Sequence, residues 1–279
     1  MKAIALDMDG TILNHNGDFP LSLARTLGEL HNAGMRIFFA TGRTKHAILE
    51  LKPEACPLDG YVAASGMGVY VGENPIETSS FKPEFVEKMI DEASEHEIYY
   101  EVHTLEKPSR TLIRDQAYAF RDIQTLSPDT MKPFEQKFVQ KALNDPAKWV
   151  DEMSYENVVK IFFFSPDLDK ITGWFNYLDA DKSQNNYELY TTSIHNAEIM
   201  LKGRDKATGL NALIKHYTID FKDVHAIGDS MNDLAMFRLA GMSTAMKNAG
   251  DNIKACTDDV TEYTCDEDGL ERYLRQKYL

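Results

Sequence analysis

Short, almost entirely apolar runs that end in acidic, hydroxyl or glycine residues are the feature that most constrains the fold of this chain. Residues 3–6 run directly into Asp7, residues 36–40 into Thr41, and residues 224–227 into Gly228. Runs of this length are typical of parallel strands that are buried on both faces of a sheet. Each run therefore predicts one strand of such a sheet.

A helix is expected between the first two runs. The apolar residues at 23, 24, 27 and 30 recur at helical spacing, and Gly34 follows as a stop signal. Strand, helix and strand form a βαβ unit, so the predicted fold class is α/β, with a Rossmann-like, doubly wound parallel sheet. In such sheets the reacting groups gather at the carboxyl ends of the strands.

The middle of the chain has a different pattern of apolar and polar residues. It predicts, in order, a helix over 83–96, a strand over 98–103, a long polar stretch with Pro108, Pro128, Pro133 and Pro146, a strand over 158–164, a helix over 167–178, and strands over 187–192 and 197–201. A short polar turn joins the last two strands, which favours an antiparallel hairpin. We therefore expect an α+β domain at 82–201, inserted into a core made of 1–81 and 202–279.

Composition excludes several classes of protein. Lys and Arg number 30 against 44 Asp and Glu, and the net charge of −14 repels nucleic acid and anionic lipid. The chain has no apolar run of the ~18 residues needed to span a bilayer, and its first residues do not resemble a signal peptide, so a cytoplasmic location is expected. Three cysteines without a C-x-x-C pair predict reduced thiols and no disulfide framework.

The strongest chemical signal is Asp7-Met8-Asp9-Gly10-Thr11, which directly follows the first predicted strand. Carboxylates at positions i and i+2 of a strand end can face one reaction centre, and Gly10 lets the chain turn sharply away. One carboxylate can act as a nucleophile and the other as an acid and base. The alternative is an Asp-Gly turn on a solvated loop.

Two further segments follow predicted strands. Thr41, Gly42 and Arg43 offer a hydroxyl, free backbone N–H groups and a guanidinium for a phosphate. The alternative is a Thr N-cap followed by an Arg that caps the helix. The segment Gly228-Asp229-Ser230-Met231-Asn232-Asp233 adds two carboxylates and an amide. Hard oxygen donors of this kind suit Mg²⁺, although Asp229 and Asp233 are also good caps for a helix over 233–239.

A charge argument links these segments. If Asp7, Asp9, Asp229 and Asp233 converge, their carboxylates repel one another and repel a bound phosphate. A divalent cation and a lysine are the expected sources of positive charge. The sequence offers Lys202 and Lys206 for the second role.

The ordered set of these motifs resembles the haloacid dehalogenase superfamily. The four motifs are Asp7-Met8-Asp9-Gly10-Thr11, Thr41-Gly42-Arg43, Lys206, and Gly228 to Asp233. The insertion is similar to the type IIB cap of the Cof-type phosphatases. Their E-I-x-P-K-G-x-x-K segment is similar to residues 198–206 and selects Lys206 over Lys202, while Ala245-Met246-Lys247-Asn248-Ala249 and residues 266–269 resemble their A-M-x-N-A and E-D-G signatures.

The resemblance implies a role for each matching residue. Asp7 is implied as the nucleophile that forms an aspartyl phosphate, and Asp9 as the acid and base. Side chains of Asp7 and Asp229 and the carbonyl of Asp9 are implied to hold Mg²⁺. The phosphoryl group is implied to lie against Thr41, Gly42, Arg43, Lys206 and Asn232, and Asp233 to orient Lys206 or a water on the metal.

One segment departs from the family pattern. Relatives commonly carry S-N-G-A after the third core strand, whereas this chain has Ala64-Ser65-Gly66-Met67. Ser65 thus replaces an amide near the expected substrate entrance, and substrate preference need not transfer. Within the insertion, candidate selectors of substrate, each of which is also an ordinary surface residue type, are Tyr100, His103, Arg110, Arg114 and His195.

The resulting prediction is a Mg²⁺-dependent phosphatase that hydrolyses small phosphorylated metabolites. Sugar phosphates are the first expected class, followed by nucleotide, flavin and pyridoxal phosphates. A phosphomutase of the phosphomannomutase type and a non-enzymatic module switched by a phosphorylated Asp are the alternatives. A dinucleotide-binding oxidoreductase is disfavoured because no G-x-G-x-x-G follows the first strand.

Overall fold

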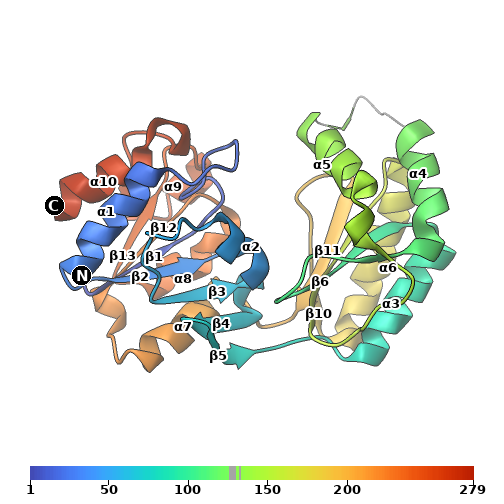
Figure 1. Cartoon of the computed structure of the whole chain (residues 1–279), viewed down its shortest axis with the longest axis horizontal. Coiled ribbons are helices and arrows are strands. Elements are labelled where there is room, and N and C mark those ends of the chain that lie inside the picture. The colour runs from blue at the N-terminus through green and yellow to red at the C-terminus, as the bar shows by residue number, and fades with distance from the viewer. Residues whose placement is uncertain (126–129, 132) are drawn as a thin grey trace. The chain divides into compact units, whose positions relative to one another are not determined.

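The computed structural model describes residues 1–125, 130–131 and 133–279, so Pro128 lies outside the described residues. The chain divides into two compact units (Figure 1). Unit 1 comprises Met1–Thr78 and Gly203–Leu279, and unit 2 comprises Ser79–Lys202.

The unit boundaries fall at 78/79 and 202/203, where the sequence had placed them at 81/82 and 201/202. Packing explains the first difference, because Phe81 is buried among the side chains of unit 2 and its N–H donates to Val158 O at 2.8 Å. At the second boundary the N–H of Lys202 donates to Asn186 O at 3.1 Å. Both residues therefore belong to unit 2.

An eight-stranded sheet forms the centre of unit 1, in the order β14-β13-β12-β1-β2-β3-β4-β5. Pairing is parallel from β14 to β3 and antiparallel along β3-β4-β5. The strands are β1 (Ala3–Leu6), β2 (Arg36–Ala40), β3 (Gly60–Ala63), β4 (Gly68–Val71), β5 (Asn74–Thr78), β12 (Val224–Gly228), β13 (Met242–Ala245) and β14 (Asp259–Val260).

Strand β1 lies between β12 and β2, with Leu6 opposite both Ile227 and Phe39. All of β1 is buried, which is why its sequence is apolar at every position. The three predicted strands and the parallel α/β fold are confirmed. Because neighbouring parallel strands end together, the residues after β1, β2 and β12 emerge at one edge of the sheet.

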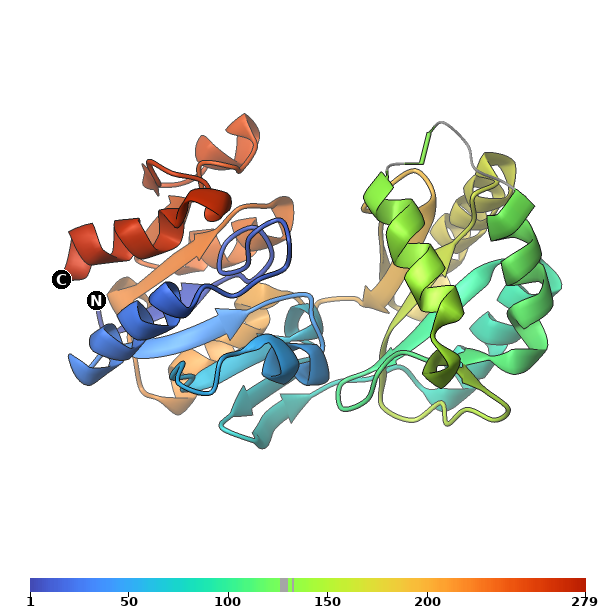
Figure 2. The same ribbon diagram turned by 45° about the horizontal axis from the view of Figure 1, so that its top comes forward.

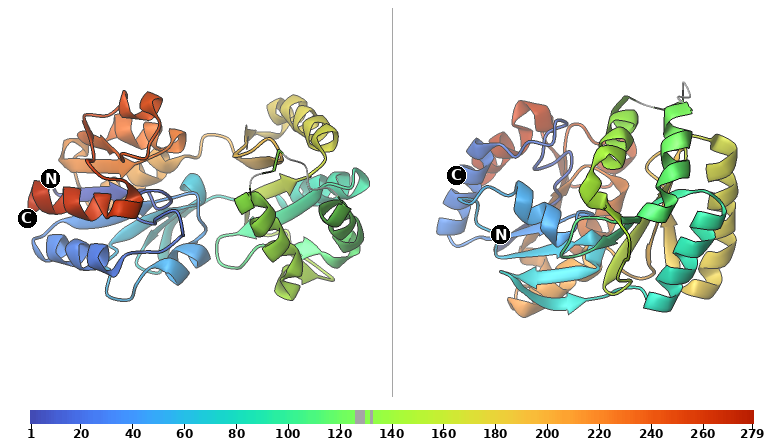
Figure 3. Two further views of the ribbon diagram at one scale, coloured as in Figure 1. Left: turned by 90° about the horizontal axis from the view of Figure 1, so that it is seen from above. Right: turned by 45° about the vertical axis from the view of Figure 1, so that its right-hand side comes forward.

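Helices cover both faces of this sheet. They are α1 (Leu21–Asn32), α2 (Lys45–Leu51), α7 (Lys206–His216), α8 (Leu234–Leu239), α9 (Asp251–Lys254) and α10 (Gly269–Tyr278). Helices α1 and α10 pack together on one face, blue and red in Figures 2 and 3. Leu210, Leu213 and Met236 of α7 and α8 bury their side chains against Ala3, Ala5 and other residues of the opposite face.

Unit 2 is an α+β unit around a four-stranded antiparallel sheet, in the order β10-β11-β9-β6. Its sheet strands are β6 (Tyr99–Thr104), β9 (Val158–Phe164), β10 (Tyr187–Tyr190) and β11 (Asn196–Leu201), and β7 (Thr111–Leu112) pairs with β8 (Trp149–Val150). The predicted hairpin is confirmed as the antiparallel β10-β11 pair. Helices α3 (Pro83–Glu95) and α6 (Leu168–Asn185) pack on one face of the sheet.

The long polar stretch between the strands predicted over 98–103 and 158–164 contains two helices, α4 (Gln116–Thr125) and α5 (Pro133–Asn144). Their buried residues, among them Ala119, Val139 and Leu143, cover the second face of the sheet around Tyr99 and Phe162. The sequence analysis did not predict these helices because the stretch contains several prolines. Pro133, however, is the first residue of α5, a position where proline is tolerated. No helix among the described residues is long and apolar enough to cross a membrane.

Candidate active site

Asp7 begins the site because it is the first residue after β1. Its N–H donates to Ile227 O at 2.9 Å, which continues the ladder with β12, and the residue is 4% exposed. The loop then turns at Gly10, where φ is +73° and an added Cβ would lie 2.3 Å from Asp229 Oδ2. A glycine is therefore required for this loop to pass beside the carboxylate of Asp229.

Lys206 meets Asp7 from the first turn of α7. Asp205 caps this helix by accepting from Thr208 N at 2.7 Å. The Lys206 ammonium donates to Asp7 Oδ1 and, at 2.6 Å, to Asp233 Oδ1, and it is 1% exposed. Lys202 is exposed and pairs with Glu188 in unit 2, so the structure places Lys206, and not Lys202, among the carboxylates.

Asp229 and Asp233 approach from the end of β12. Asp233 Oδ2 accepts from the N–H groups of Asp229 and Ser230, each at 3.0 Å, while Oδ1 binds Lys206. Asp233 therefore both fixes the backbone that carries Asp229 and orients the lysine. One oxygen each of Asp7, Asp229 and Asp233 lie within 4.8 Å of one another, and we call these three residues the acidic cluster.

The electrostatics of the acidic cluster favour a bound cation. Burial raises the pKa of Asp7 well above its usual value, although the Lys206 charge opposes this. Burial, assisted by Asp233, raises the pKa of Asp229 to about 6. Burial acts to lower the pKa of Lys206, but Asp7 and Asp233 outweigh it and hold that pKa above its ordinary value. One buried ammonium does not neutralise three carboxylates, so the oxygen donors fit a hard divalent ion such as Mg²⁺.

Thr41 and Arg43 follow β2 at the same edge of the sheet. Thr41 is fully buried and its Oγ1 accepts from Arg43 N at 3.1 Å. The N-cap of α2 is Thr44, whose Oγ1 accepts from Ala47 N. The capping alternative considered for this segment thus applies to Thr44 and leaves Thr41 outside the helix.

Asp9 is not part of the acidic cluster. Its carboxylate is 58% exposed and accepts from Arg43 Nε at 3.0 and 3.1 Å and from Nη2 at 2.6 Å. Asn232 is also exposed, and its Oδ1 accepts from Ser230 Oγ at 2.9 Å. The structure thus places Asp9 and Asn232 on exposed parts of the segments that carry Asp7 and Asp233.

The segment after β3 has an unusual backbone. Ala64 and Ser65 have φ values of +46° and +51°, a left-handed conformation that costs energy for residues with a side chain. Gly66 follows at φ +98°, and an added Cβ there would lie 2.3 Å from Asp205 O. An added Cβ at Gly42 would lie 3.5 Å from Ser65 Oγ, so this serine lies beside the segment after β2.

The prediction that residues of unit 2 select the substrate is wrong for two of the five candidates, because these two are buried. Tyr100 is fully buried and donates to Asp115 Oδ2 at 2.6 Å, and His195 is fully buried with its Nδ1 against Ser165 O at 3.1 Å. Both are core residues of unit 2. The accessible candidates are His103, beside Glu101; Arg110, which donates to Ser109 O; and Arg114, which binds Asp91.

Asn248 is a site residue to which the sequence analysis gave no role. Its Nδ2 donates to Gly10 O at 2.8 Å and approaches Asp229 Oδ2 at 3.3 Å, while its Oδ1 accepts from Cys265 N at 3.0 Å. This amide ties together the loops that carry Asp7 and Asp229. The sequence feature that pointed to Asn248 was the motif at residues 245–249, which resembles the A-M-x-N-A signature of the family.

Known proteins resemble this chain over nearly its whole length. A phosphatase of Bacillus subtilis named 5-amino-6-(5-phospho-D-ribitylamino)uracil phosphatase YwtE is 29% identical, with 99% of this chain and 98% of that protein covered. A haloacid dehalogenase-like hydrolase from Bacteroides thetaiotaomicron superposes with a TM-score of 0.78 at 22% identity, covering 99% of each chain. A sugar phosphatase of haloacid dehalogenase subclass IIB superposes with a TM-score of 0.72 at 24% identity, covering 99% of this chain and 98% of the other. Residues 4–274 match the haloacid dehalogenase-like hydrolases. The chain belongs to this family of hydrolases.

Proposed function

We propose that the protein is a Mg²⁺-dependent phosphatase that hydrolyses small phosphorylated metabolites through an aspartyl-phosphate intermediate. The observation that carries the proposal is the acidic cluster, in which Asp7 and Asp233 bind the buried Lys206 and Asp229 lies close to both carboxylates. Such a site presents a carboxylate oxygen to the phosphorus beside a buried ammonium, and a divalent cation would supply the further positive charge that a phosphate needs. Membership of the hydrolase family agrees with this chemistry.

Asp7 acts as the nucleophile. One of its carboxylate oxygens forms a bond to phosphorus while the bond from phosphorus to the leaving alkoxide breaks, and Asp9 gives that alkoxide a proton. In the second half, Asp9 takes a proton from water, the water oxygen bonds to phosphorus, and the bond to Asp7 breaks. Inorganic phosphate leaves and both carboxylates return to their starting states.

Positive charge and hydrogen-bond donors hold the phosphoryl group. Lys206, already fixed between two carboxylates, supplies one charge, and Arg43 supplies a second beside Asp9. Thr41, Gly42 and Asn232 are the proposed polar contacts. Side chains of Asp7 and Asp229 with the carbonyl of Asp9 would hold Mg²⁺, which supplies charge that stabilises the transferring phosphoryl oxygens.

The two units have separate roles in this proposal. Unit 1 is the hydrolase core, since it contains every residue assigned to the chemistry, and unit 2 is a type IIB cap that selects the substrate. A cap of this kind excludes bulk water and adds contacts to the leaving group. We place the protein in the cytoplasm, where its substrates are metabolites and not nucleic acid or membrane.

Sugar and polyol phosphates are the proposed substrate class. One relative is named for a phosphorylated ribitylamino uracil, and one structural neighbour is described as a sugar phosphatase. Sugars and ribityl groups are both polyhydroxylated. Ser65 differs from the asparagine usual in relatives, so the preferred member of the class is to be found by experiment and not by transfer.

The test is a phosphate-release screen with purified full-length protein. The panel holds sugar phosphates, the ribitylamino uracil phosphate, and nucleotide, flavin and pyridoxal phosphates, each with Mg²⁺ and with EDTA. We expect release with Mg²⁺ only, and none from Asp7→Asn. Activity that persists in Asp7→Asn contradicts the assigned nucleophile.

Product analysis separates the alternatives. An isomerised sugar phosphate without inorganic phosphate identifies a phosphomutase. A stable aspartyl phosphate that lasts many minutes without turnover identifies a signalling module. Multiple turnovers to inorganic phosphate exclude both alternatives and support the phosphatase.

A further inference from the structure

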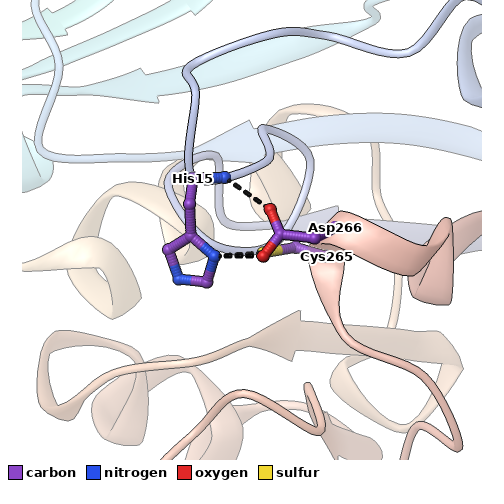
Figure 4. A group of neighbouring side chains, drawn as sticks. All are labelled: His15, Cys265 and Asp266. Atoms are coloured by element: carbon purple, nitrogen blue, oxygen red, sulfur yellow. Dashed lines mark hydrogen bonds and ion pairs between the residues drawn. The ribbon is translucent and has the colours of Figure 1, made fainter.

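Three potential metal ligands meet outside the acidic cluster. His15 belongs to the loop that follows β1, while Cys265 and Asp266 begin the short helical turn Cys265–Glu267 (Figure 4). His15 Nδ1 lies 2.5 Å from Asp266 Oδ2 and 3.6 Å from Cys265 Sγ. One ligand atom from each residue lies within 4.8 Å of the other two.

The backbone around these three side chains is well fixed. Asn14 Oδ1 accepts from Asn16 N and Asp18 N at 3.0 and 2.9 Å, which shapes the loop on both sides of His15. His15 N donates to Asp266 Oδ1 at 2.9 Å. Cys265 N donates to Asn248 Oδ1, and Cys265 is 5% exposed. The thiol is thus held at the base of the group, while the His15 and Asp266 side chains are 63% and 48% exposed.

The distances fit a tetrahedral ion with one adjustment. Bond lengths of about 2.05 Å to nitrogen and about 2.3 Å to sulfur put the two ligand atoms about 3.6 Å apart in a tetrahedral zinc site. That is the separation of His15 Nδ1 and Cys265 Sγ. Two ligands of nitrogen and oxygen type are about 3.3 Å apart, so the Asp266 carboxylate must move back by about 1 Å. Its exposure leaves room for that movement.

The donor set selects the class of ion. Imidazole nitrogen, thiolate sulfur and carboxylate oxygen suit a borderline transition ion, whereas Mg²⁺ takes oxygen ligands. We propose that His15, Cys265 and Asp266 form a second metal site, which takes Zn²⁺ or a similar transition ion and ties the loop after β1 to the C-terminal segment. Water fills the fourth position. The site does not depend on the proposed phosphatase activity.

Binding exchanges an ion for a proton. Burial, together with the nearby Asp266 and Asp229 carboxylates, raises the pKa of the Cys265 thiol to about 11, so the thiol is protonated at neutral pH without an ion. The ion replaces the Sγ proton, which goes to solvent, and takes the place beside Nδ1 that Asp266 Oδ2 occupies in the structure. Binding therefore releases the thiol proton to solvent.

Cobalt(II) is the probe that tests this site. Metal-free full-length protein is titrated with Co²⁺ in a buffer that contains a phosphine reductant and excess Mg²⁺. The Mg²⁺ is added to occupy the acidic cluster. We expect a thiolate-to-cobalt charge-transfer band that saturates at one equivalent, and a weaker affinity, by tenfold or more, in His15→Gln. Zn²⁺ should displace the band and raise the melting temperature by a few degrees.

Cysteine variants decide the outcome. Cys256→Ser is the matched control, since Cys256 is an exposed free thiol elsewhere in unit 1, and it should retain the band, as should Asp229→Asn. Cys265→Ser should lose the band while its circular dichroism melt without metal stays cooperative. Absence of a thiolate band in the unaltered protein, survival of the band in Cys265→Ser, or its loss in Cys256→Ser would overturn the proposal. If Cys265→Ser does not fold, the His15→Gln titration decides instead.

Discussion

Arg43 donates hydrogen bonds from both Nε and Nη2 to the Asp9 carboxylate, and this ion pair joins the segments that follow β1 and β2. The arrangement keeps a cation beside the residue proposed as acid and base. Because both side chains are partly exposed, the pair contributes little to stability but remains available to a substrate. Arg43 therefore has the position of a residue that serves the reaction more than the fold.

Replacing Arg43 with Gln should affect turnover and leave stability almost unchanged. We expect kcat/KM to fall about 10- to 100-fold, because a charge that contacts the phosphate is lost, while the free energy of unfolding changes by less than about 1 kcal/mol. Steady-state kinetics and urea unfolding measure the two effects. An unfolding change larger than the kinetic one would assign Arg43 to the fold.

Replacing Lys206, unlike replacing Arg43, should lower stability strongly. Lys206→Met leaves the carboxylates of Asp7 and Asp233 buried without their cation, and breaking a buried pair in this way costs about 3–5 kcal/mol. Lys202→Met is the matched control, since Lys202 is exposed, and it should cost less than about 0.5 kcal/mol. Urea unfolding of both variants in EDTA provides the comparison, and equal losses would contradict the burial argument.

Asp7→Asn tests the nucleophile separately from the fold. The pKa of Asp7 is raised by burial, so its charged form is disfavoured and a neutral amide should be tolerated. Lys206 keeps Asp233 as a partner. We expect a loss of kcat of at least about 10³-fold with a melting temperature within a few degrees of the parent. Asp9→Asn serves as the comparison, with a loss of about 10²- to 10⁴-fold because only proton transfer is removed.

Local pattern was enough to predict the core of the fold. Strands β1, β2 and β9 were predicted with the bounds that the structure shows, because each is buried on both faces or bounded by strong turn signals. Helices α4 and α5 were missed, since few of the residues whose burial the structure describes in each are buried and the stretch contains prolines. Whether such segments form helices depends on the sheet face that they cover, which a single sequence does not reveal.

The site was predictable to the level of segments but not of contacts. Parallel strands place their carboxyl ends at one edge of the sheet, so the convergence of Asp7 with Asp229 could be expected. Residue-level pairing depends on side-chain reach, and that is why the Asp9–Arg43 pair and the bridging role of Asn248 emerged only from the structure. Burial of Tyr100 likewise depends on helices α3 and α6, and His195 contacts Ser165 and Phe164, residues about 30 positions away in the sequence.

Ser65→Asn should relieve backbone strain after β3. Ser65 sits at φ +51°, where asparagine is better tolerated than serine, so we expect a gain in stability of up to about 1 kcal/mol. The larger amide lies beside Gly42 and should change KM more than kcat across the substrate panel. Urea unfolding and a comparison of kcat/KM between substrates measure both effects. A uniform fall in kcat would contradict a role in substrate choice.

The pKa of Asp229 predicts how stability changes with pH in the absence of divalent ions. This pKa is about 6 in the folded protein and about 3.9 in the unfolded chain, so the folded state binds more protons between these values. The contribution of Asp229 to the free energy of unfolding is therefore greatest below pH 4 and is lost as the pH rises through 6, a change of roughly 1–3 kcal/mol. Asp229→Asn removes the titration, so its unfolding free energy relative to the parent should increase from pH 4.5 to pH 7 in EDTA. Saturating Mg²⁺ should cancel this advantage, because the ion stabilises the charged carboxylate that the variant lacks. A difference between variant and parent that stays constant across this range would show that Asp229 ionises with an ordinary pKa.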